Sequence, residues 1–334
     1  MLRNLWRRTK DIFSRVFRRE PLAPGRFESG TRFSWRGFLL VAPWIWPQRD
    51  YLVYVPRGYV RWRRTTLLVL IHGCRQSAQD IAAGTRITQL ADALSCLVLL
   101  PCQDPRANAW GCWNWFDRRT TVGAGEAAIV AAQIRAVRRR YRIHRKRVFV
   151  AGMSSGAGLA AALALRHSAL FAGVFVHSGM AAGAASSPVT AVSVLQRGPD
   201  TDVAAIAAAA RRAAGARARI VPILVVHGTL DETVVPVHAS EVVRQFLVFA
   251  GHPGATAAPA ALPSPDREFT AELAGARRTT TSEWRHQGRL LARRVMVDGL
   301  AHAWSGGEAQ LPYNDAAPPD ATALLGAFVS DVLR

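Results

Sequence analysis

Short apolar runs alternate with longer segments of helical character along most of the chain. The runs are nearly continuous in Val, Leu, Ile and aromatic residues, which is typical of strands buried on both faces of a parallel sheet. The pattern predicts strands at 50–55, 66–72, 96–101, 147–151, 173–177, 220–227 and 290–297. It predicts helices at 79–94, 124–141, 155–167, 239–250 and 320–333. This alternation favours an α/β fold, a mostly parallel, doubly wound sheet with helices on both faces and the early strand at an antiparallel edge.

Three stretches depart from this alternation. Residues 181–219 are rich in Ala and Arg, and we expect them to form a helical excursion over the functional site. Residues 251–282 are rich in Ala, Pro, Gly and Thr, which favours a mobile surface loop. Pro, Gly and aromatic residues at 21–49 indicate a linker followed by an edge strand or loop. We therefore expect an N-terminal segment and linker at 1–49 and one folded domain at 50–334.

The first 20 residues carry apolar side chains at roughly helical spacing together with many basic ones. Seven positive residues outnumber the two negative ones, Asp11 and Glu20. The segment has no continuous apolar centre and no small-residue cleavage site, so it is not expected to be a secretory signal. Two interpretations remain open. The segment is either a helix lying on an anionic membrane or granule surface, or a basic amphipathic tail packed on the domain.

Composition limits the class of protein. Half of the 334 residues are hydrophobic and 20% are charged, which allows a sizeable core and excludes wholesale disorder. The longest apolar run, 38–46, is too short to cross a membrane and contains a proline, so a soluble protein is expected, cytoplasmic or peripheral to a membrane or granule. The positive charge behind the net charge of +20 is almost all arginine, and it reflects either coding composition or attraction to a polyanion or an anionic membrane surface. Nucleic acid is not favoured, since no zinc-finger spacing, RRM-like motif or helix-turn-helix is found.

The strand at 147–151 leads into a G-x-S-x-G sequence with Ser154 at its centre. A serine on a sharp turn between a strand and a helix is held in a strained conformation with its hydroxyl above the sheet. Strand and helix pass so close to such a turn that the residues two before and two after it, Gly152 and Gly156, must lack side chains. Ser154 is therefore the candidate nucleophile.

A nucleophilic hydroxyl needs a histidine base, and the base needs an acid that orients it. In this architecture the acid and then the histidine follow the serine in the chain. Of the histidines after Ser154, His302 is favoured because it follows the last predicted strand in a loop of small residues. Asp231, four residues beyond strand 220–227, is the favoured acid, with Glu232 and Asp298 as competitors. No metal and no organic cofactor is expected.

The oxyanion that forms during such a reaction needs two backbone donors. The amide of Ser155 follows the nucleophile, and the amide of Cys74 lies in the loop after strand 66–72. Cys74 and Cys112 fall on loops and could be bridged, whereas the absence of a C-x-x-C pair disfavours zinc and thioredoxin chemistry. The cluster Trp113-Asn114-Trp115 is interpreted as a wall of the substrate cleft, although aromatic residues are usually core.

Six sequences resemble the polyhydroxybutyrate depolymerase family of esterases, in the α/β-hydrolase superfamily. They are HGCRQSA, CWNWF, GMSSGAG, VHSG, HGTLDETV and DGLAHAWSGG, and they occur in the order of that family. The resemblance runs from about residue 50 to the last residue and implies an α/β-hydrolase fold. It also implies Ser154 as nucleophile, Asp231 as acid and His302 as base, with the Cys74 and Ser155 amides as the oxyanion hole.

The expected function is a serine carboxylic-ester hydrolase that cleaves 3-hydroxyalkanoate polyesters, oligomers or short acyl esters through an acyl-enzyme. Arg75 stands where relatives often carry a small polar residue, which favours a substrate with a free carboxylate. Trp304 is expected to contact the substrate together with the Trp113–Trp115 cluster. The alternatives are a feruloyl or acetyl esterase acting on polysaccharides, an acyltransferase on the same triad, and a binding protein without catalysis. Many relatives are exported, so an extracellular location is the alternative to the cytoplasm.

Overall fold

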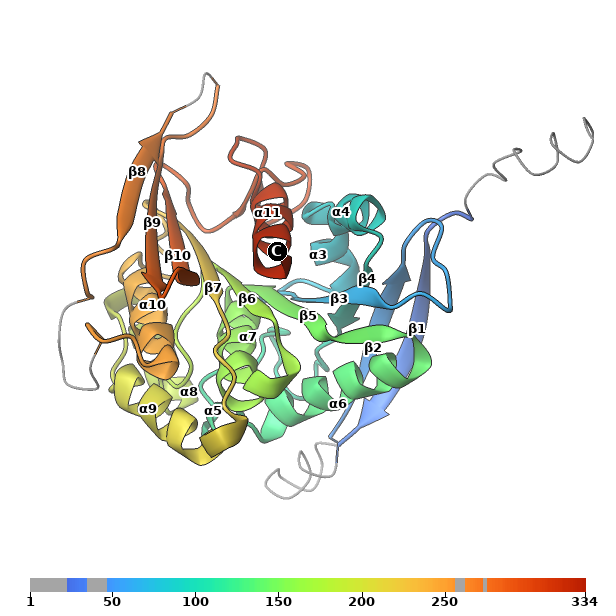
Figure 1. Cartoon of the computed structure of the whole chain (residues 1–334), viewed down its shortest axis with the longest axis horizontal. Helices are drawn as coiled ribbons and strands as arrows, with labels where there is room; N and C mark the ends of the chain where they lie inside the picture. Colours follow the sequence, from blue (N-terminus) through green and yellow to red (C-terminus); the bar gives the residue numbers. More distant parts are fainter. Residues whose placement is uncertain (1–22, 35–46, 256–261, 273–274) are drawn as a thin grey trace, which may run out of the picture.

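A ten-stranded sheet organises the protein (Figure 1). The computed structural model describes residues 23–34, 47–255, 262–272 and 275–334. Within these residues the strands lie side by side in the order β1-β2-β4-β3-β5-β6-β7-β10-β9-β8. The strands are β1 (Arg26–Phe33), β2 (Gln48–Val55), β3 (Thr65–Ile71), β4 (Leu97–Pro101), β5 (Ile143–Met153), β6 (Gly173–His177), β7 (Ile223–Gly228), β8 (Arg267–Ala271), β9 (Thr279–His286) and β10 (Arg289–Val297). The central strands β4 to β10 in this order are parallel, and antiparallel strands flank them at both edges.

Helices cover both faces of the sheet. On one face lie α6, α7, α9 and α10, and on the other lie α3, α4 and α11 (Figure 1). The helices are α3 (Ala78–Gly84), α4 (Ile87–Leu94), α5 (Arg118–Thr121), α6 (Gly125–Arg140), α7 (Ser155–Arg166), α8 (Pro188–Arg197), α9 (Val203–Ala214), α10 (Val237–Ala250) and α11 (Ala321–Leu333), with 3₁₀ turns η1 (Ser168–Leu170) and η2 (Gly215–Arg217). A short pair, β11 (Trp304–Ser305) and β12 (Asn314–Asp315), precedes α11. The prediction of a doubly wound sheet is confirmed.

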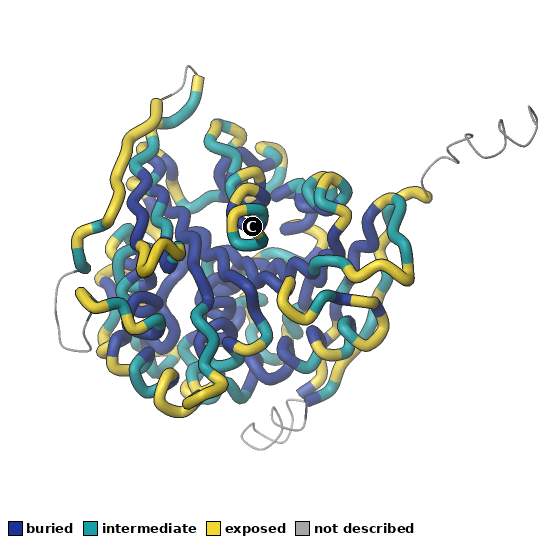
Figure 2. The backbone as a smooth tube through the Cα atoms, viewed as in Figure 1, coloured by how far each residue is buried: buried dark blue, intermediate teal, exposed yellow. Residues whose placement is uncertain are grey.

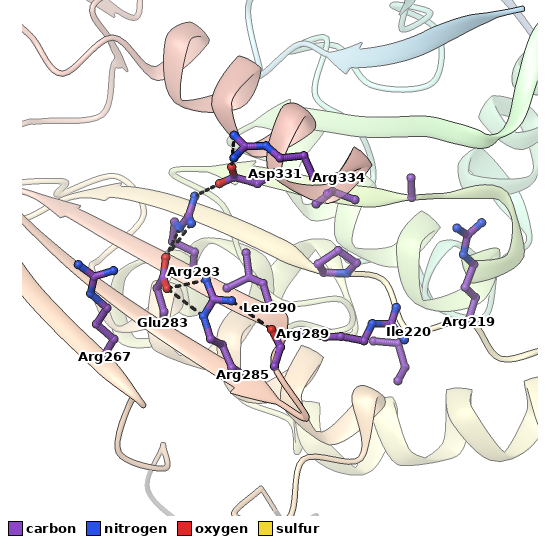
Figure 3. Close-up of a pocket in the computed structure, with 14 residues that line it drawn as sticks. Arg219, Ile220, Arg267, Glu283, Arg285, Arg289, Leu290, Arg293, Asp331 and Arg334 are labelled. Carbon is purple, nitrogen blue, oxygen red and sulfur yellow. Dashed lines mark hydrogen bonds and ion pairs between the residues drawn. The ribbon is translucent and has the colours of Figure 1, made fainter.

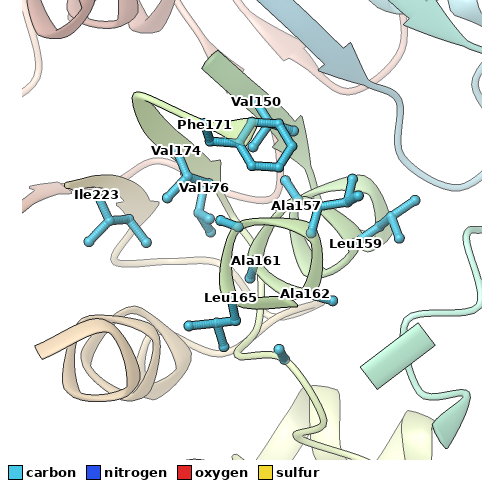
Figure 4. Close-up of a cluster of buried hydrophobic side chains, with 14 of the residues drawn as sticks. Val150, Ala157, Leu159, Ala161, Ala162, Leu165, Phe171, Val174, Val176 and Ile223 are labelled. Carbon is cyan, nitrogen blue, oxygen red and sulfur yellow. The ribbon is translucent and has the colours of Figure 1, made fainter. Parts of the chain in front are cut away.

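The core lies on both faces of the central strands (Figure 2). Along β5, Val148 and Val150 join the cluster under α7, whereas Phe149 and Ala151 join the cluster under α11, because successive side chains of a strand point to opposite faces. Figure 4 shows α7 in the first cluster beside the valines of β5 and β6, with Ala157 on the side of the helix that faces them. Small alanine side chains let the helix approach the sheet closely, which fixes the turn that begins it.

The predicted helix 79–94 is two helices, α3 and α4. The break falls at Arg86, whose backbone is left-handed with φ 54°. Gly84 faces Asn314 so closely that a Cβ at Gly84 would lie 2.4 Å from the Asn314 side chain. The Arg86 guanidinium also donates to the carbonyl of Gly306 and pairs with Asp320. The helix is interrupted because a loop distant in sequence packs into it, and a local pattern cannot report that contact.

The expected surface loop at 251–282 contains the strand β8 and the beginning of β9. All five residues of β8 are exposed, so no apolar alternation marks it, and its pairing with β9 forms it. Residues 50–55, in β2, are antiparallel to their neighbours, as expected. The edge strand, however, is β1, which pairs with the outer side of β2. The sheet therefore includes residues before 50, within the segment where an edge strand or loop was predicted.

The helical excursion expected at 181–219 is present as α8 and α9. The amphipathic segment 1–20 and the apolar run 38–46 lie outside the described residues. In the described part of the chain, every helix is too short or too polar to pass through a lipid bilayer.

Candidate active site

Ser154 occupies the turn between β5 and α7 with φ 54° and ψ −123°. A Cβ at Gly152 would lie 2.4 Å from the carbonyl oxygen of Gly156, and one at Gly156 would lie 2.3 Å from that of Ile71. Contacts this short with backbone atoms exclude a side chain at either glycine. The amide of Ser154 donates to the carbonyl of His177 on β6 at 3.0 Å. The strained turn that the G-x-S-x-G spacing predicts is therefore present, with its two glycines in the expected contacts.

Asp231 and His302, which are 71 positions apart in the chain, form a hydrogen bond. The Oδ2 of Asp231 accepts from Nδ1 of His302 at 2.8 Å. The other carboxylate oxygen accepts from the amides of Thr233 and Val234 at 3.1 and 2.8 Å. Burial opposes ionisation of the Asp231 carboxyl, but the hydrogen bond from His302 and the nearby donors hold its pKa below the ordinary value. An ionised Asp231 fixes the proton of His302 on Nδ1 and leaves Nε2 free to accept another.

The other histidine near the acid has a different environment. His227, at the end of β7, is fully buried, and its Nε2 donates to the carbonyl of Val234 at 2.7 Å. Burial lowers the pKa of His227 to about 4, so the ring is neutral at pH 7. His227 therefore bonds within the turn that follows β7. Of the competing acids, Asp298 is exposed and Glu232 lies in the pocket wall, and Asp231 is the carboxylate that contacts His302.

Ser154 and His302 line the same pocket, which has a volume of about 780 Å³. Leu195 from α8, Leu230 and Tyr313 form much of its apolar wall, and Arg75 adds a positive charge. In the described residues no hydrogen bond joins the hydroxyl of Ser154 to His302. Such bonds are often long in free enzymes and shorten when substrate binds. The structure thus brings Ser154 and His302 to one pocket, with the buried Asp231 bonded to His302, and shows one of the two contacts that a triad requires.

The two predicted oxyanion donors lie beside Ser154. Ser155 is the first residue of α7, where helix amides have no partner within the helix. Cys74 lies in the loop after β3, and Gly73 in that loop approaches the Ser154 side chain so closely that a Cβ there would be 3.3 Å from it. Among the described residues neither the Cys74 nor the Ser155 amide donates to a protein acceptor. Both amides are therefore available to an anion in the pocket.

A disulfide joins Cys74 to Cys112 and confirms the bridge considered from the sequence. It fastens the loop of Cys74 to the segment before α5. The amide of Arg75 donates to the carbonyl of Trp110 at 2.8 Å, and the Arg75 guanidinium stacks on the Trp110 ring 4.4 Å from its centroid. These three contacts hold the loop that carries the Cys74 amide.

Replacement of Cys112 by serine is expected to lower the free energy of unfolding by about 2–4 kcal/mol, because the bridge closes a loop of 38 residues in the unfolded chain. It should also lower ester turnover, since the Cys74 loop loses an anchor. Urea unfolding and the rate of p-nitrophenyl butyrate cleavage measure the two effects. Cys102, a free cysteine, supplies the control Cys102→Ser. Equal stability of the Cys112 variant and wild type would show that the bridge does not constrain the protein.

The tryptophans expected to form a cleft wall lie inside the protein. Trp113 and Trp304 are at most 1% exposed and Trp115 is 4% exposed, so none of the three rings reaches the pocket surface. Asn114 is bound through its amide groups to the buried carboxylate of Glu126 at 2.7 and 2.9 Å. The interpretation of these four residues as substrate contacts is corrected accordingly. The apolar rings belong to the core, whereas Arg75 does lie in the pocket.

Two buried groups near the site were not predicted from sequence. Glu126 also accepts from Gln103 at 2.6 Å, so one carboxylate holds both ends of the segment that carries Cys112. Burial raises the pKa of Glu126, and the nearby Arg49 opposes that effect. His177 stacks on Trp304 with the ring centroids 4.9 Å apart, and its Nε2 accepts from the amide of Ser305. The sequence features that could have indicated these two residues are the position of Glu126 early in a predicted helix and that of His177 at the end of a predicted strand.

Comparison with known proteins first defines the class. The structure resembles an acetyl xylan esterase from Aspergillus awamori with a TM-score of 0.62 and 21% identity, covering 76% of this chain and 89% of that one. This likeness, with the mostly parallel sheet, shows the α/β-hydrolase fold. Residues 49–267 match the sequence profile described as "Esterase PHB depolymerase". The chain belongs to this family.

Two curated relatives match parts of this chain. Poly(3-hydroxyalkanoate) depolymerase C of Paucimonas lemoignei is 30% identical over 200 residues, which are 59% of this chain and 48% of that protein. Acetylxylan esterase A of Talaromyces purpureogenus is 31% identical over 133 residues, which are 39% of this chain and 34% of that protein. The chain thus spans half or less of the length of these two relatives.

Proposed function

We propose that the protein is a serine carboxylic-ester hydrolase with Ser154, Asp231 and His302 as its catalytic triad. The observation that carries the proposal is the 2.8 Å bond between Asp231 and His302, formed at the pocket that Ser154 also lines. The serine stands on a strained strand-to-helix turn, the geometry that exposes a nucleophile. Membership of the esterase PHB depolymerase family supports the same activity.

The proposed reaction proceeds through an acyl-enzyme. Nε2 of His302 takes the proton of the Ser154 hydroxyl, and Oγ attacks the ester carbonyl carbon. The carbonyl oxygen becomes an oxyanion that accepts from the amides of Cys74 and Ser155, each held in place before substrate arrives. The C–O bond of the ester then breaks, and His302 gives its proton to the leaving alcohol. Water repeats the sequence on the acyl-enzyme, releases the acid and restores Ser154. Asp231 stays ionised and stabilises the imidazolium of each cycle.

The substrate proposed is a 3-hydroxyalkanoate oligomer or polyester. The pocket of about 780 Å³ has room for more than one short ester unit, and Leu195, Leu230 and Tyr313 give it apolar walls. Leu230 in the wall is 62% exposed, and Trp110, which stacks on the pocket residue Arg75, is 61% exposed. Arg75 in the wall offers a guanidinium to the free carboxylate that ends a hydroxyacid oligomer. The similarity to a poly(3-hydroxyalkanoate) depolymerase supports this class.

Acetyl esters of polysaccharides are the second candidate, favoured by the similarity to acetylxylan esterases. A panel of hydroxybutyrate oligomers, amorphous polymer, methyl ferulate and acetylated xylan separates the candidates. We expect the oligomers to give the highest kcat/KM. Turnover confined to acetylated xylan or methyl ferulate would replace the hydroxyalkanoate proposal, and no turnover of any ester would overturn the esterase proposal.

Arg75→Gln is expected to raise KM for a hydroxybutyrate trimer with a free carboxylate by about tenfold, because the charge-assisted contact is lost. The methyl ester of the same trimer is the matched substrate, and its KM should change little, since it has no charge to lose. Steady-state kinetics on the two trimers measure the difference. An equal rise in both KM values would mean that Arg75 shapes the loop and does not bind the carboxylate.

We further propose that the protein acts in an oxidising compartment, the extracellular alternative to the cytoplasmic expectation. The bridge between Cys74 and Cys112 supports this location, because disulfides persist in such compartments. As a separate proposal, the basic segment 1–20 contacts an anionic membrane or polymer granule surface, which its basic and apolar residues at roughly helical spacing favour. Titration of four free thiols in the unreduced, unfolded protein would contradict the oxidised state.

A further inference from the structure

A second pocket, of about 620 Å³, is lined by arginines (Figure 3). It lies where β6, β7 and β10 begin, since Ala172, Pro222 and Arg289 each stand at or just before the first residue of a strand. Ser154, Asp231 and His302 follow the carboxyl ends of parallel strands. The two pockets therefore lie at opposite ends of the parallel strands. A ligand in the second pocket does not contact the candidate triad.

The arginines of this pocket outnumber its carboxylates. Six arginine side chains line it together with two carboxylates, Glu283 and Asp331. The buried Glu283 pairs with Arg285 at 3.1 Å and with Arg293 at 2.7 Å, and Asp331 pairs with Arg293 and Arg334 at 3.1 and 3.2 Å. These pairs fix three guanidinium groups in one chain of contacts (Figure 3).

The other three arginines have no such partner. Among the described residues, the side chains of Arg219, Arg267 and Arg289 form no ion pair with a carboxylate, and Arg267 instead packs on the ring of Phe269. They come from three segments, the approach to β7, strand β8 and the start of β10. Figure 3 shows Arg219 and Arg267 on opposite sides of the paired group. The side chains around the pocket thus leave four positive charges without neutralisation.

We propose that this pocket binds an oligophosphate. A guanidinium presents parallel N–H donors that fit two phosphate oxygens at once, so Arg is well suited to phosphate groups. A single phosphate would reach only part of a ring of arginines spread around a cavity of about 620 Å³. A chain of linked phosphates carries several charges along its length and contacts guanidinium groups on different sides. The site is built by Glu283 and Asp331, which hold three arginines in place, and the three unpaired arginines complete it.

The test uses tripolyphosphate as the probe and isothermal titration calorimetry on the whole protein. We expect saturable binding to one site at low ionic strength. The triple variant Arg219→Ala, Arg267→Ala, Arg289→Ala should weaken that binding at least tenfold, because the unpaired guanidinium groups are gone. The matched control, Arg61→Ala, Arg63→Ala, Arg64→Ala, removes the same charge from exposed positions outside the pocket and should bind as wild type does. Thermal unfolding verifies that both variants are folded.

Each other outcome overturns the proposal. Equal weakening by the two triple variants would mean that the net charge of the protein, and not this pocket, attracts the anion. Undiminished binding by the pocket variant would show that the anion binds elsewhere. The absence of binding by wild type would show that the pocket holds no oligophosphate. Citrate is the competing anion, and binding as tight as that of tripolyphosphate would show a site for polyanions in general and contradict the phosphate preference. Ester turnover is not a readout, so the result stands whether or not the proposed activity does.

Discussion

Ser154→Ala is expected to lower kcat for p-nitrophenyl butyrate by about 10⁴-fold or more, since a triad that loses its nucleophile loses nearly all of its effect. The variant keeps the turn, because the strained φ of 54° is set by Gly152, Gly156 and the packing of α7, not by the hydroxyl. KM should change little, since the pocket walls are unaltered. Initial rates at saturating ester measure the loss, and thermal unfolding verifies the fold.

Ser155→Ala is the matched control for that experiment. It makes the same chemical change one residue later and keeps the backbone amide assigned to the oxyanion hole. The Ser155 hydroxyl accepts from the amide of Trp113 at 3.4 Å, a long hydrogen bond, so the expected loss is below about tenfold. If Ser154→Ala retains more than a tenth of the wild-type kcat, another residue is the nucleophile. If the two variants lose activity equally, the turn and not the hydroxyl is what matters.

The parts of the fold that the sequence predicts are those in which local pattern and tertiary contact agree. β5 is apolar on both faces because helices cover both, and its valines and Phe149 are the signal of that environment. Glycine is required at positions 152 and 156 because a Cβ there would lie within 2.4 Å of backbone oxygen atoms. The motif therefore predicts the geometry of the turn directly. Chain order and the loops around them predict Asp231 and His302, and the structure places the two side chains 2.8 Å apart.

The parts that could not be predicted depend on partners distant in the chain. β8 has five exposed residues and exists through its pairing with β9. The break between α3 and α4 is made by the loop of Gly306 and Asn314. Aromatic residues such as Trp113 and Trp304 are common in cleft walls and in cores. Whether such a ring faces solvent depends on what is packed over it. The ring that packs over Trp304 belongs to His177, 127 residues earlier in the chain. Burial in this contact lowers the pKa of His177 to about 3.

Asp231→Asn is expected to lower kcat by about 10⁴-fold, the size associated with loss of the correct histidine tautomer. An asparagine oxygen still accepts from the amides of Thr233 and Val234, so the loop keeps its shape. The amide nitrogen would then face Nδ1 of His302, where two N–H donors cannot meet. The imidazole therefore carries its proton on Nε2, which can no longer take the proton of Ser154. Initial rates measure the loss, and Asp298→Asn, at an exposed carboxylate near the same loops, should leave the rate unchanged.

The same substitution has a defined pH dependence. The pKa of Asp231 lies below its ordinary value in the folded protein, so its ionised form stabilises the fold at pH values above the ordinary pKa of about 3.9. That contribution is lost as the pH falls through the lowered pKa, because the folded and unfolded carboxyls are then both protonated. The asparagine side chain of the variant does not titrate, so the stability difference between wild type and Asp231→Asn should narrow as the pH is lowered past about 4. Urea unfolding at a series of pH values measures this difference, and a gap that stays constant down to acid pH would mean that the Asp231 carboxylate gains nothing from His302 in the folded state.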